Sequence, residues 1–397
     1  MRWLAVVPIL LVACADPSAT PGPDAGPGDG GGDAASCPRS LAPADGPRHV
    51  VVSMPYDAAG GQASTWARWT LGADGALTDT GTRFQMGRAT GGEVAFTPDG
   101  AIGVAAQSDG SLGVFRIDGD AVTVVHAAFH GSFYAERVVM AADGAGAYVI
   151  DPNWATNGGG VYRVDIACDG TLTDRGRWFD TKLAAGLHLG GAGGATRAVM
   201  PAAQVGASPI GDDVHVLDWS TDPPTRLAGA DAFGDDDAIV GGSAVTADGR
   251  FALVGDTSQF AGVPNRVAVV RLDGATATPV TVLSPVEDPY AIVASPFDDA
   301  ALVVSGFGDA LVRLGYAPTA ATPFVVRGPL TYVGAPPQLP GDAVLIDRGA
   351  QRGLVLVAEN VGIRRVRFAG GGAITDLGKT STGTGTAAIV GALGVQP

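Results

Sequence analysis

Basic residues are scarce in this sequence. Lysine and arginine together number 25, against 40 aspartates and glutamates, which leaves a formal net charge of -15. Proteins that bind nucleic acids neutralise phosphates with clustered basic side chains, so this composition argues against a nucleic-acid partner. A strongly negative surface repels its own copies and attracts cations. We therefore expect a monomer, and we expect any bound ion to be a cation.

The sequence also lacks the short motifs of common catalytic centres. It contains no HExxH, CxxC or GxSxG motif and no P-loop. The stretch "GTGTAA" (383–388) fits a dinucleotide-binding fingerprint. Too few residues follow it here for the helix and second strand that such a fold needs. We therefore exclude a dinucleotide-binding fold at this stretch.

Long apolar runs are absent as well. The longest lies in "MRWLAVVPILLVAC", where Arg2 precedes a run that is too short to span a bilayer as a permanent helix. The run ends in Leu11-Val12-Ala13-Cys14, which resembles the lipobox of bacterial lipoproteins. The resemblance implies cleavage before Cys14 and a diacylglycerol on its thiol. An ordinary secretory signal with a chance cysteine is the alternative.

The residues that follow Cys14 predict a tether. They are rich in glycine, proline and aspartate and carry little that could be buried in a core. We expect a signal peptide at 1–13, a tether at 14–47 and a folded body at 48–397. The chain would be exported and anchored by lipid to the bacterial cell envelope, with the anchor as its only membrane contact. An aspartate directly after Cys14 would suggest retention at the inner membrane. Ala15 stands at this position instead, which favours the outer membrane.

Only two further cysteines are present, Cys37 and Cys168. Exported proteins fold in an oxidising compartment, so a disulfide between these two residues is a reasonable expectation. It would fix the end of the tether to the folded body. Two free thiols are the alternative.

What the sequence does contain is glycine, with 60 residues, and a repeat. Short Val, Ala, Ile and Leu runs are broken by Gly, Asp and Pro, which is typical of many short strands. The stretch "EVAFTPDGAIGVAAQSDG" (93–110) has similar copies in "RVVMAADGAGAYVIDP" (137–152), "GSAVTADGRFALVGDT" (242–257) and "AIVASPFDDAALVVSG" (291–306). Each copy continues with a third apolar stretch, a tight turn and a fourth, as in "NRVAVVRLDG" (265–274).

This repeat predicts the fold. A four-stranded unit that recurs at roughly 50 residues is typical of a β-propeller blade, and Asp-Gly suits its two-residue turns. The first unit begins at "HVVVSMP" (49–55) without a first strand, whereas "TAAIVGALG" (386–394) is a first strand with nothing after it. We therefore predict an all-β protein, a seven-bladed β-propeller of four-stranded antiparallel blades. Its C-terminal strand would complete blade one.

The stretch "TADGRFALVGD", followed by "RVAVVRLDG", is similar to the repeat of a known family. It resembles the seven-bladed family of YVTN-repeat surface proteins and 6-phosphogluconolactonase-like propellers. The resemblance covers almost the whole body and implies the fold. Propellers of this kind serve as enzymes, sensors and scaffolds, so it leaves the function open.

Loop lengths predict which side of the ring is functional. In such blades the first-to-second and third-to-fourth turns lie on one face, which we call the short-turn face. The second-to-third loops and the connections between blades lie on the other, the long-loop face. The loops of this second set are long, as at 151–160, 256–265 and 332–342. Because functional groups usually lie in long loops on a rigid scaffold, we expect one working face, around the ring axis.

Acidic side chains gather where the chain leads into blades five to seven. Such oxygen-rich groups suit Ca²⁺, although a solvated acidic rim without an ion is the simpler explanation. The candidate metal ligands are Asp235, Asp236, Asp237, Glu287, Asp288 and Asp342.

The segments that lead into blades two to four carry residue types that a lactonase requires. Such an enzyme needs a general base that activates water and a cation that holds an anionic substrate. A Glu93–Arg137 ion pair between adjacent blades is an equally good structural explanation. The candidate catalytic residues are His130, Glu136, Arg137 and His188, joined at blade two by Arg88 and Glu93 as ligand-binding candidates.

Aromatic side chains lie on or beside the same loops. They suit a stacking surface for glycans or partner proteins, and packing between blades is the alternative for several of them. The set is Tyr56, Trp66, Phe133, Tyr134, Trp154, Phe260, Tyr290 and Tyr332, of which Tyr134, Trp154, Phe260 and Tyr290 are ligand-binding candidates.

Together these features predict a binding or interaction module at the cell envelope that uses its long-loop face, with a protein or a glycan as partner. The alternative is a lactonase-type hydrolase that acts on a sugar lactone at the mouth of the ring. Histidine, glutamate and arginine side chains that converge there would favour the alternative.

Overall fold

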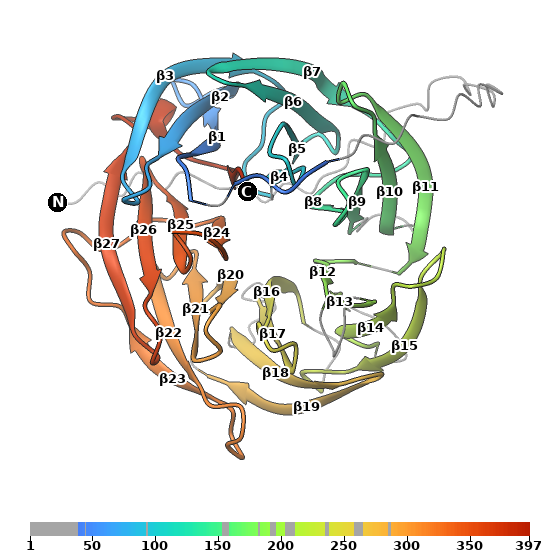
Figure 1. The fold of residues 1–397 in the computed structure, drawn as a ribbon. Coiled ribbons are helices and arrows are strands. Elements are labelled where there is room, and N and C mark those ends of the chain that lie inside the picture. Colours follow the sequence, from blue (N-terminus) through green and yellow to red (C-terminus); the bar gives the residue numbers. More distant parts are fainter. Residues whose placement is uncertain are drawn as a thin grey trace.

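A computed structural model describes residues 39–43, 45–92, 94–152, 159–181, 183–190, 196–202, 211–234, 238–257, 265–284 and 287–397. These residues form seven four-stranded antiparallel sheets, arranged as a ring with one strand of each sheet innermost (Figure 1). The predicted all-β, seven-bladed propeller is therefore confirmed. No helix within these ranges is long and apolar enough to cross a membrane.

Blade one joins the two ends of the chain. Its innermost strand, β28 (Leu393–Val395), pairs with β1 (Arg48–Tyr56), and Val51 lies opposite Gly394. The closing strand is thus confirmed, but it starts later than the predicted 386–394, because η2 (Thr386–Ala388) forms a short 3-10 helix there. The other strands of this blade are β2 (Gln62–Leu71) and β3 (Leu77–Gln85).

Blades two to seven each use four consecutive strands, with the first innermost. Blade two contains β4 (Val94–Phe96), β5 (Ile102–Ala106), β6 (Leu112–Asp118) and β7 (Ala121–Phe129). Blade three contains β8 (Arg137–Met140), β9 (Gly146–Asp151), β10 (Gly160–Ile166) and β11 (Leu172–Asp180). Blade four contains β12 (His188–Leu189), β13 (Arg197–Pro201), β14 (Val214–Asp218) and β15 (Thr225–Ala230).

The remaining three blades follow the same order. Blade five contains β16 (Val240–Val245), β17 (Phe251–Asp256), β18 (Arg266–Asp273) and β19 (Thr276–Leu283). Blade six contains β20 (Pro289–Ala294), β21 (Ala300–Ser305), β22 (Ala310–Tyr316) and β23 (Phe324–Pro329). Blade seven contains β24 (Ala343–Ile346), β25 (Leu354–Glu359), β26 (Gly362–Phe368) and β27 (Ile374–Ser381).

The hydrophobic core lies between neighbouring blades. One cluster joins Val104 of blade two to Val149 of blade three, and another joins Leu253 of blade five to Val303 of blade six. Second strands such as β17 are buried along their whole length, because a blade covers each of their two faces. Outer strands such as β3, by contrast, alternate between more buried and exposed residues, since one of their faces is open to water.

The Asp-Gly turns of the short-turn face have a common geometry. In blade two, the Asp99 carboxylate accepts the Thr97 hydroxyl at 2.6 Å and the Ala101 N–H at 3.1 Å. Gly100 follows at φ 71°, a region that favours glycine. Blade five repeats the carboxylate contacts at Asp248. In these two blades the opening motif of the repeat therefore forms a turn that its own carboxylate stabilises.

Buried carboxylates fix the opposite, long-loop face. The Asp151 carboxylate, at the end of β9, accepts the N–H of Tyr134 in the connection into its own blade, at 3.0 Å. The Asp256 carboxylate, at the end of β17, accepts the N–H of Ile239 at 3.0 Å. Much of the acidic charge on this face therefore holds the blade connections in place.

The segment ahead of β1 lies against the short-turn face. The Ala42 N–H donates to the Pro98 carbonyl in blade two, and Arg348 of blade seven donates to the Ala42 carbonyl, both at 2.9 Å. The Arg39 guanidinium reaches the Ala167 carbonyl in blade three at 3.1 Å. Residues 39–43, which we call the strap, therefore bridge three blades.

Candidate binding site at the channel mouth

Side chains of four successive blades meet where the innermost strands begin on the long-loop face. Arg137 opens β8, His188 opens β12, Ser243 lies in β16 and Tyr290 lies in β20. Glu136 directly precedes β8. We call these five residues the mouth cluster, and the region around the ring axis at this end the mouth.

Two polar contacts tie the cluster together across blades. His188 Nε2 lies 2.9 Å from the Ser243 hydroxyl, which joins blades four and five. The Arg137 guanidinium of blade three donates to the Gly241 carbonyl of blade five at 3.5 Å. Arg137 therefore reaches past blade four, whose innermost strand has only two residues.

Tyr290 extends toward the other side of the mouth. A Cβ atom on Gly91, in the connection from blade one to blade two, would lie 2.5 Å from the Tyr290 hydroxyl oxygen. Only glycine leaves room for this approach. The Tyr290 ring is also near Gly341 in the connection into blade seven, where a Cβ would lie 3.8 Å from Cε1. The tyrosine thus spans from blade six to the connection that enters blade two.

Two of the five side chains are positioned by irregularities in their strands. The pairing of β16 with β17 shifts register between Val240 and Ser243, and that of β20 with β21 shifts between Pro289 and Ala291. Such β-bulges redirect a side chain relative to regular alternation. This explains why the repeat pattern did not predict Ser243, which sequence reasoning missed.

Electrostatics keep two members of the cluster uncharged. Burial, with a smaller contribution from the positive charge of Arg137, lowers the pKa of His188 to about 4, so its imidazole is neutral at pH 7. Burial also raises the pKa of Tyr290, and the carboxylate of Asp342 adds to the increase, so the phenol keeps its proton.

Solvent reaches the Glu136 side chain, but protein groups surround its carboxyl group. Its side chain is exposed, yet desolvation by the surrounding ring raises its pKa, and the negative charge of Asp151 adds to this effect. The positive charge of Arg137 opposes the shift. A carboxyl group with a raised pKa beside a cation is a candidate for proton transfer.

A cavity of about 530 Å³ adjoins the cluster between blades three, four and five. His188 lines it and is the residue that it shares with the mouth cluster. Polar and apolar atoms share its surface about equally, and the other residues that line it are Val139, Met140, Ala142, Leu187, Leu189, Gly190, Val245, Thr246 and Ala247.

Three of the four predicted catalytic residues converge in this site, namely Glu136, Arg137 and His188. The fourth, His130, lies in the connection between β7 and β8. Within the described part of the chain it makes no hydrogen bond or ion pair with the cluster. Arg88 lies apart from the cluster as well, since it donates to the Pro55 carbonyl at 3.3 Å and stacks 5.3 Å from the Tyr56 ring centre.

The predicted aromatic surface divides into different roles. Trp66 and Phe133 are buried in the cores between blades, and Tyr332 lies beneath the Arg364 guanidinium, 5.4 Å from its ring centre. Tyr134 is 48% exposed, and its hydroxyl donates to the Ser108 carbonyl at 2.8 Å. Among the members of this set that the structure describes, Tyr290 alone belongs to the mouth cluster.

Two of the predicted metal ligands have structural partners. The Asp288 carboxylate accepts the Phe307 N–H at 2.7 Å, and the Asp342 carboxylate accepts the Leu393 N–H of the closing strand at 3.4 Å. Glu287 is exposed. Among the described residues, no three His, Cys, Asp or Glu side chains are grouped to hold a metal ion.

Several predicted residues lie outside the described ranges, so their roles stay predictions. They are Cys14, Cys37, Glu93, Trp154, Asp235, Asp236, Asp237 and Phe260. Cys168 is disulfide-bonded. Its pairing with Cys37 remains an expectation.

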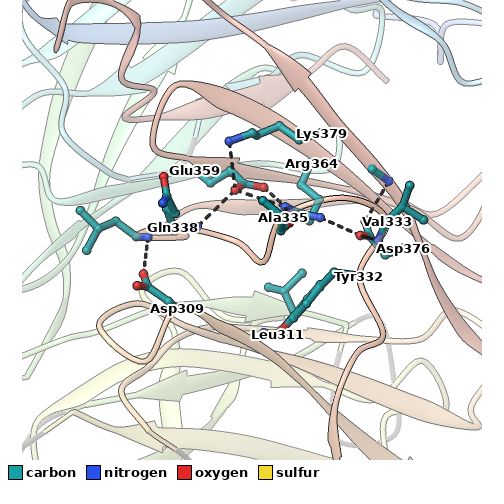
Figure 2. Close-up of polar contacts among 12 residues, drawn as sticks. Asp309, Leu311, Tyr332, Val333, Ala335, Gln338, Glu359, Arg364, Asp376 and Lys379 are labelled. Atoms are coloured by element: carbon teal, nitrogen blue, oxygen red, sulfur yellow. Dashed lines mark hydrogen bonds and ion pairs between the residues drawn. The ribbon is translucent and has the colours of Figure 1, made fainter. Parts of the chain in front are cut away.

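The connection into blade seven is fixed by a buried charge cluster (Figure 2). Arg364 of β26, 1% exposed, donates to the carboxylates of Glu359 and Asp376, each at 2.6 Å, and to the Ala335 carbonyl at 2.8 Å. The Glu359 carboxylate also accepts the Gln338 N–H at 3.2 Å. This long connection is therefore held rigidly at the rim, which preorganises the face around the mouth.

No protein-family model matches the chain, and no curated protein does. Solved structures do match in three dimensions. The periplasmic gluconolactonase PpgL of Pseudomonas aeruginosa superposes with a TM-score of 0.62 at 14% identity, over 89% of this chain and 99% of that one. A protein assigned as a 6-phosphogluconolactonase from Bacteroides fragilis superposes with a TM-score of 0.59 at 12% identity, over 88% and 98%.

A third similar structure is a binding protein. Sqt1 of Chaetomium thermophilum, solved with the N-terminus of the ribosomal protein L10, superposes with a TM-score of 0.55 at 13% identity, over 84% of each chain. At these identities the likeness establishes the fold only. The chain has the seven-bladed architecture of the 6-phosphogluconolactonase-like propellers, and that architecture serves both enzymes and binding proteins.

Proposed function

We propose that this chain is a cell-envelope binding module whose mouth cluster takes a small, uncharged, polyhydroxylated molecule of the carbohydrate type. The observation that carries the proposal is the meeting of polar side chains from four successive blades at one end of the ring axis. Recognition at such a site needs a few well-placed polar groups on a rigid frame, and the propeller provides the frame.

The chemistry of the cluster favours hydroxyl groups over charged ones. His188 and Tyr290 are neutral at pH 7 for the reasons given above, and the positive charge of Arg137 is faced by Glu136. The cluster therefore combines donors and acceptors with little net charge. A sugar hydroxyl both donates and accepts hydrogen bonds, so a polyol complements this mixture.

The location at the envelope is also a proposal, and it rests on the export signal, the Leu11–Cys14 motif and the tether. Fractionation of cells that express the full chain would test it. We expect the wild-type chain in the membrane fraction and a Cys14→Ser variant in the soluble exported fraction. A wild-type chain that fractionates as soluble would contradict the lipid anchor. The binding proposal does not depend on this result.

Calorimetric titration with methyl glucoside and related simple sugars would test the binding proposal. Ser243→Ala and Tyr290→Phe each remove one hydroxyl, and we expect each to weaken binding by about tenfold, the usual effect of one lost hydrogen bond. Tyr134→Phe is the matched control, because it removes a rim hydroxyl that donates to the Ser108 carbonyl. If no sugar of the panel binds, or if the control weakens binding as much, the proposal fails.

Hydrolysis of a sugar lactone is the second candidate, and the raised pKa of Glu136 beside Arg137 favours it. Glu136 would accept a proton from water as the water oxygen attacks the lactone carbonyl carbon. The ring C–O bond would then break, and its oxygen would take up a proton to leave a hydroxy acid. Two solved structures of similar fold, which are named as lactonases, also support this second candidate.

An acid-release assay with glucono-1,5-lactone separates the two candidates. An enzyme would release acid above the spontaneous rate, and Glu136→Gln would lower its rate by about a hundredfold or more, as expected for loss of a general base. Sugar binding without acid release would reject the hydrolase and retain the binding module.

A further inference from the structure

Three large apolar side chains are exposed on one sector of the long-loop face. Phe307, in the loop between β21 and β22, is 47% exposed, and Val333 and Leu339, in the connection into blade seven, are 60% and 43% exposed. The connection reads Val-Gly-Ala-Pro-Pro-Gln-Leu over 333–339, without a charge, and Pro337 is its one buried residue. We call Phe307 and residues 333–339 the apolar patch. Apolar surface that is continuous in this way is typical of an interaction site, whereas single exposed residues are not.

Carboxylates fix the backbone of the apolar patch. The Val333 N–H donates to the Asp376 carboxylate of blade seven at 2.7 Å, and the Leu339 N–H donates to the Asp309 carboxylate of blade six at 2.6 Å. Figure 2 shows Asp376 and Asp309 on the two sides of the buried charge cluster. The Phe307 N–H is held by a carboxylate as well, as described above. The patch therefore has one fixed arrangement, and little conformational freedom is lost when a partner binds to it.

Two apolar residues in this region have a backbone conformation that favours glycine. Leu339 has φ 44°, and Val361, in the adjoining turn between β25 and β26, has φ 49°. The turn contacts the connection, since the Asn360 N–H donates to the Gln338 carbonyl at 2.8 Å. Glycine or asparagine would adopt such a φ with less strain. The Leu339 side chain is exposed, so packing within the ring does not account for it, and strain of this kind gathers at functional sites.

The charges beside the apolar patch decide which kind of partner fits. The Glu287 side chain is exposed, and its carboxylate lies over Gly308, where a Cβ atom would be 2.6 Å away. Asp309 is exposed as well. Within the described part of the chain, neither carboxylate forms an ion pair. Since opposite charges attract and like charges repel, this sector favours a basic partner over an anionic membrane or a second copy of a chain whose net charge is -15.

We propose that the apolar patch docks a protein segment that combines apolar side chains with lysine or arginine. The apolar groups would pack on Phe307, Val333 and Leu339. The basic groups would pair with Glu287 and Asp309. An apolar centre with polar groups around it is the usual plan of a protein interface. This surface is separate from the mouth cluster, and the inference does not rest on the ligand proposed there.

Selection from a library of displayed random peptides, with the full chain as the target, tests the inference. We expect the recovered peptides to carry apolar residues together with Lys or Arg. A synthetic peptide of a recovered sequence should then bind the chain in calorimetric titration. Added salt should weaken this binding, because salt screens charge pairs that are exposed to solvent.

Leu339→Asn separates docking from structure. Asparagine is polar and tolerates a positive φ, so we expect the melting temperature to equal or exceed that of the wild type. Affinity for the selected peptide should nevertheless fall by about tenfold or more, as for the loss of a central interface residue. Glu287→Gln should weaken the same peptide by about threefold and reduce the effect of salt. The matched control is Leu227→Asn, an exposed leucine on outer strand β15, which should leave the affinity unchanged.

Several results would overturn the inference. A selection that recovers no peptide, or peptides without basic residues, would contradict the charge argument. Equal affinity of the peptide for the wild type and for Leu339→Asn would place docking elsewhere. Binding to vesicles of phosphatidylethanolamine and phosphatidylglycerol that Leu339→Asn abolishes would mean that a membrane covers the patch. A dimer that Leu339→Asn dissociates would mean that a second copy covers it. Methyl glucoside enters none of these measurements, so failure of the proposed function is distinguishable from failure of this inference.

Discussion

His215 lies in the centre of blade four with only 4% of its surface exposed. Neither ring nitrogen has a hydrogen-bond partner among the described residues, and burial lowers the pKa of the imidazole to about 4. Well above pH 6.5, the ordinary pKa of histidine, the ring is neutral in both the folded and the unfolded chain, so it costs no stability there. As the pH falls toward 4, the unfolded chain takes up a proton and the folded chain does not.

Stability should therefore fall between pH 7 and pH 5. With a folded pKa of about 4, His215 accounts for a loss of about 2 kcal/mol in the free energy of unfolding over this interval. We expect His215→Leu to remove that share, as measured by urea unfolding at both pH values. His130→Leu, in a loop, is the control. An unchanged difference in the His215→Leu variant would mean that another group is responsible.

At the residue scale, the sequence predicted most of the residues that the structure brings together at the mouth. Glu136, Arg137, His188 and Tyr290 were predicted because each stands where the chain leads into a blade, next to the ring axis. Ser243 could not be found in this way, since a register shift in β16 places its hydroxyl beside His188. Strand alternation read from sequence assumes regular pairing, and a bulge breaks that assumption.

Among elements, the connection into blade seven depends on one arginine. Arg364 is the shared partner of Glu359 and Asp376, whose side chains are fully buried. Removal of one member of a buried ion cluster leaves charges without compensation and costs about 3–5 kcal/mol. We expect Arg364→Met to lower the free energy of unfolding by this amount. Hydrogen exchange of the Val333 and Gln338 amides, which donate to the same carboxylates, should become faster.

Arg327→Met is the comparison for that variant, because Arg327 is an exposed arginine on outer strand β23. We expect its effect to stay within about 0.5 kcal/mol, as for surface substitutions in general. Equal effects of the two variants on stability would show that the buried cluster does not hold the connection.

The closing strand β28 requires a glycine at its centre. A Cβ atom on Gly394 would overlap the Cβ of Val94 in β4, so blades one and two could not pack as closely. We expect Gly394→Ala to lower the free energy of unfolding by about 1–3 kcal/mol, as overpacking usually does. Gly46→Ala is the control, since nothing lies within 4 Å of its Cβ position. Equal melting temperatures for both variants would contradict this account.

On the scale of the whole molecule, the repeat made the fold predictable. Asp-Gly turns and four apolar stretches per unit occur in most blades, and local pattern is enough to recognise them. The closing strand was placed too early, because "TAAIVGALG" has the apolar composition of a strand but η2 occupies its start. The sequence could not predict which loops are held in place by hydrogen bonds and which are not. That depends on contacts between distant residues, such as the one from Arg364 to the Ala335 carbonyl.

The ring as a whole is held by more than its closing strand. The strap adds a second bridge on the short-turn face, and Arg39 is its buried anchor, with a side chain that is 2% exposed and pairs with Asp99 at 3.3 Å. The strap therefore lies on the short-turn face, opposite the mouth.

Arg39→Met tests whether the strap stabilises the ring. The variant removes charged hydrogen bonds to Asp99 and to the Ala167 carbonyl, and we expect a loss of about 1.5–3 kcal/mol in the free energy of urea unfolding. Arg83→Met is the matched control, because its Asp79 partner lies on the same outer strand and both side chains are about one-third exposed. Such a surface pair contributes less than about 1 kcal/mol. If both variants lose the same amount, the strap is a surface contact, and ring closure rests on β28 alone.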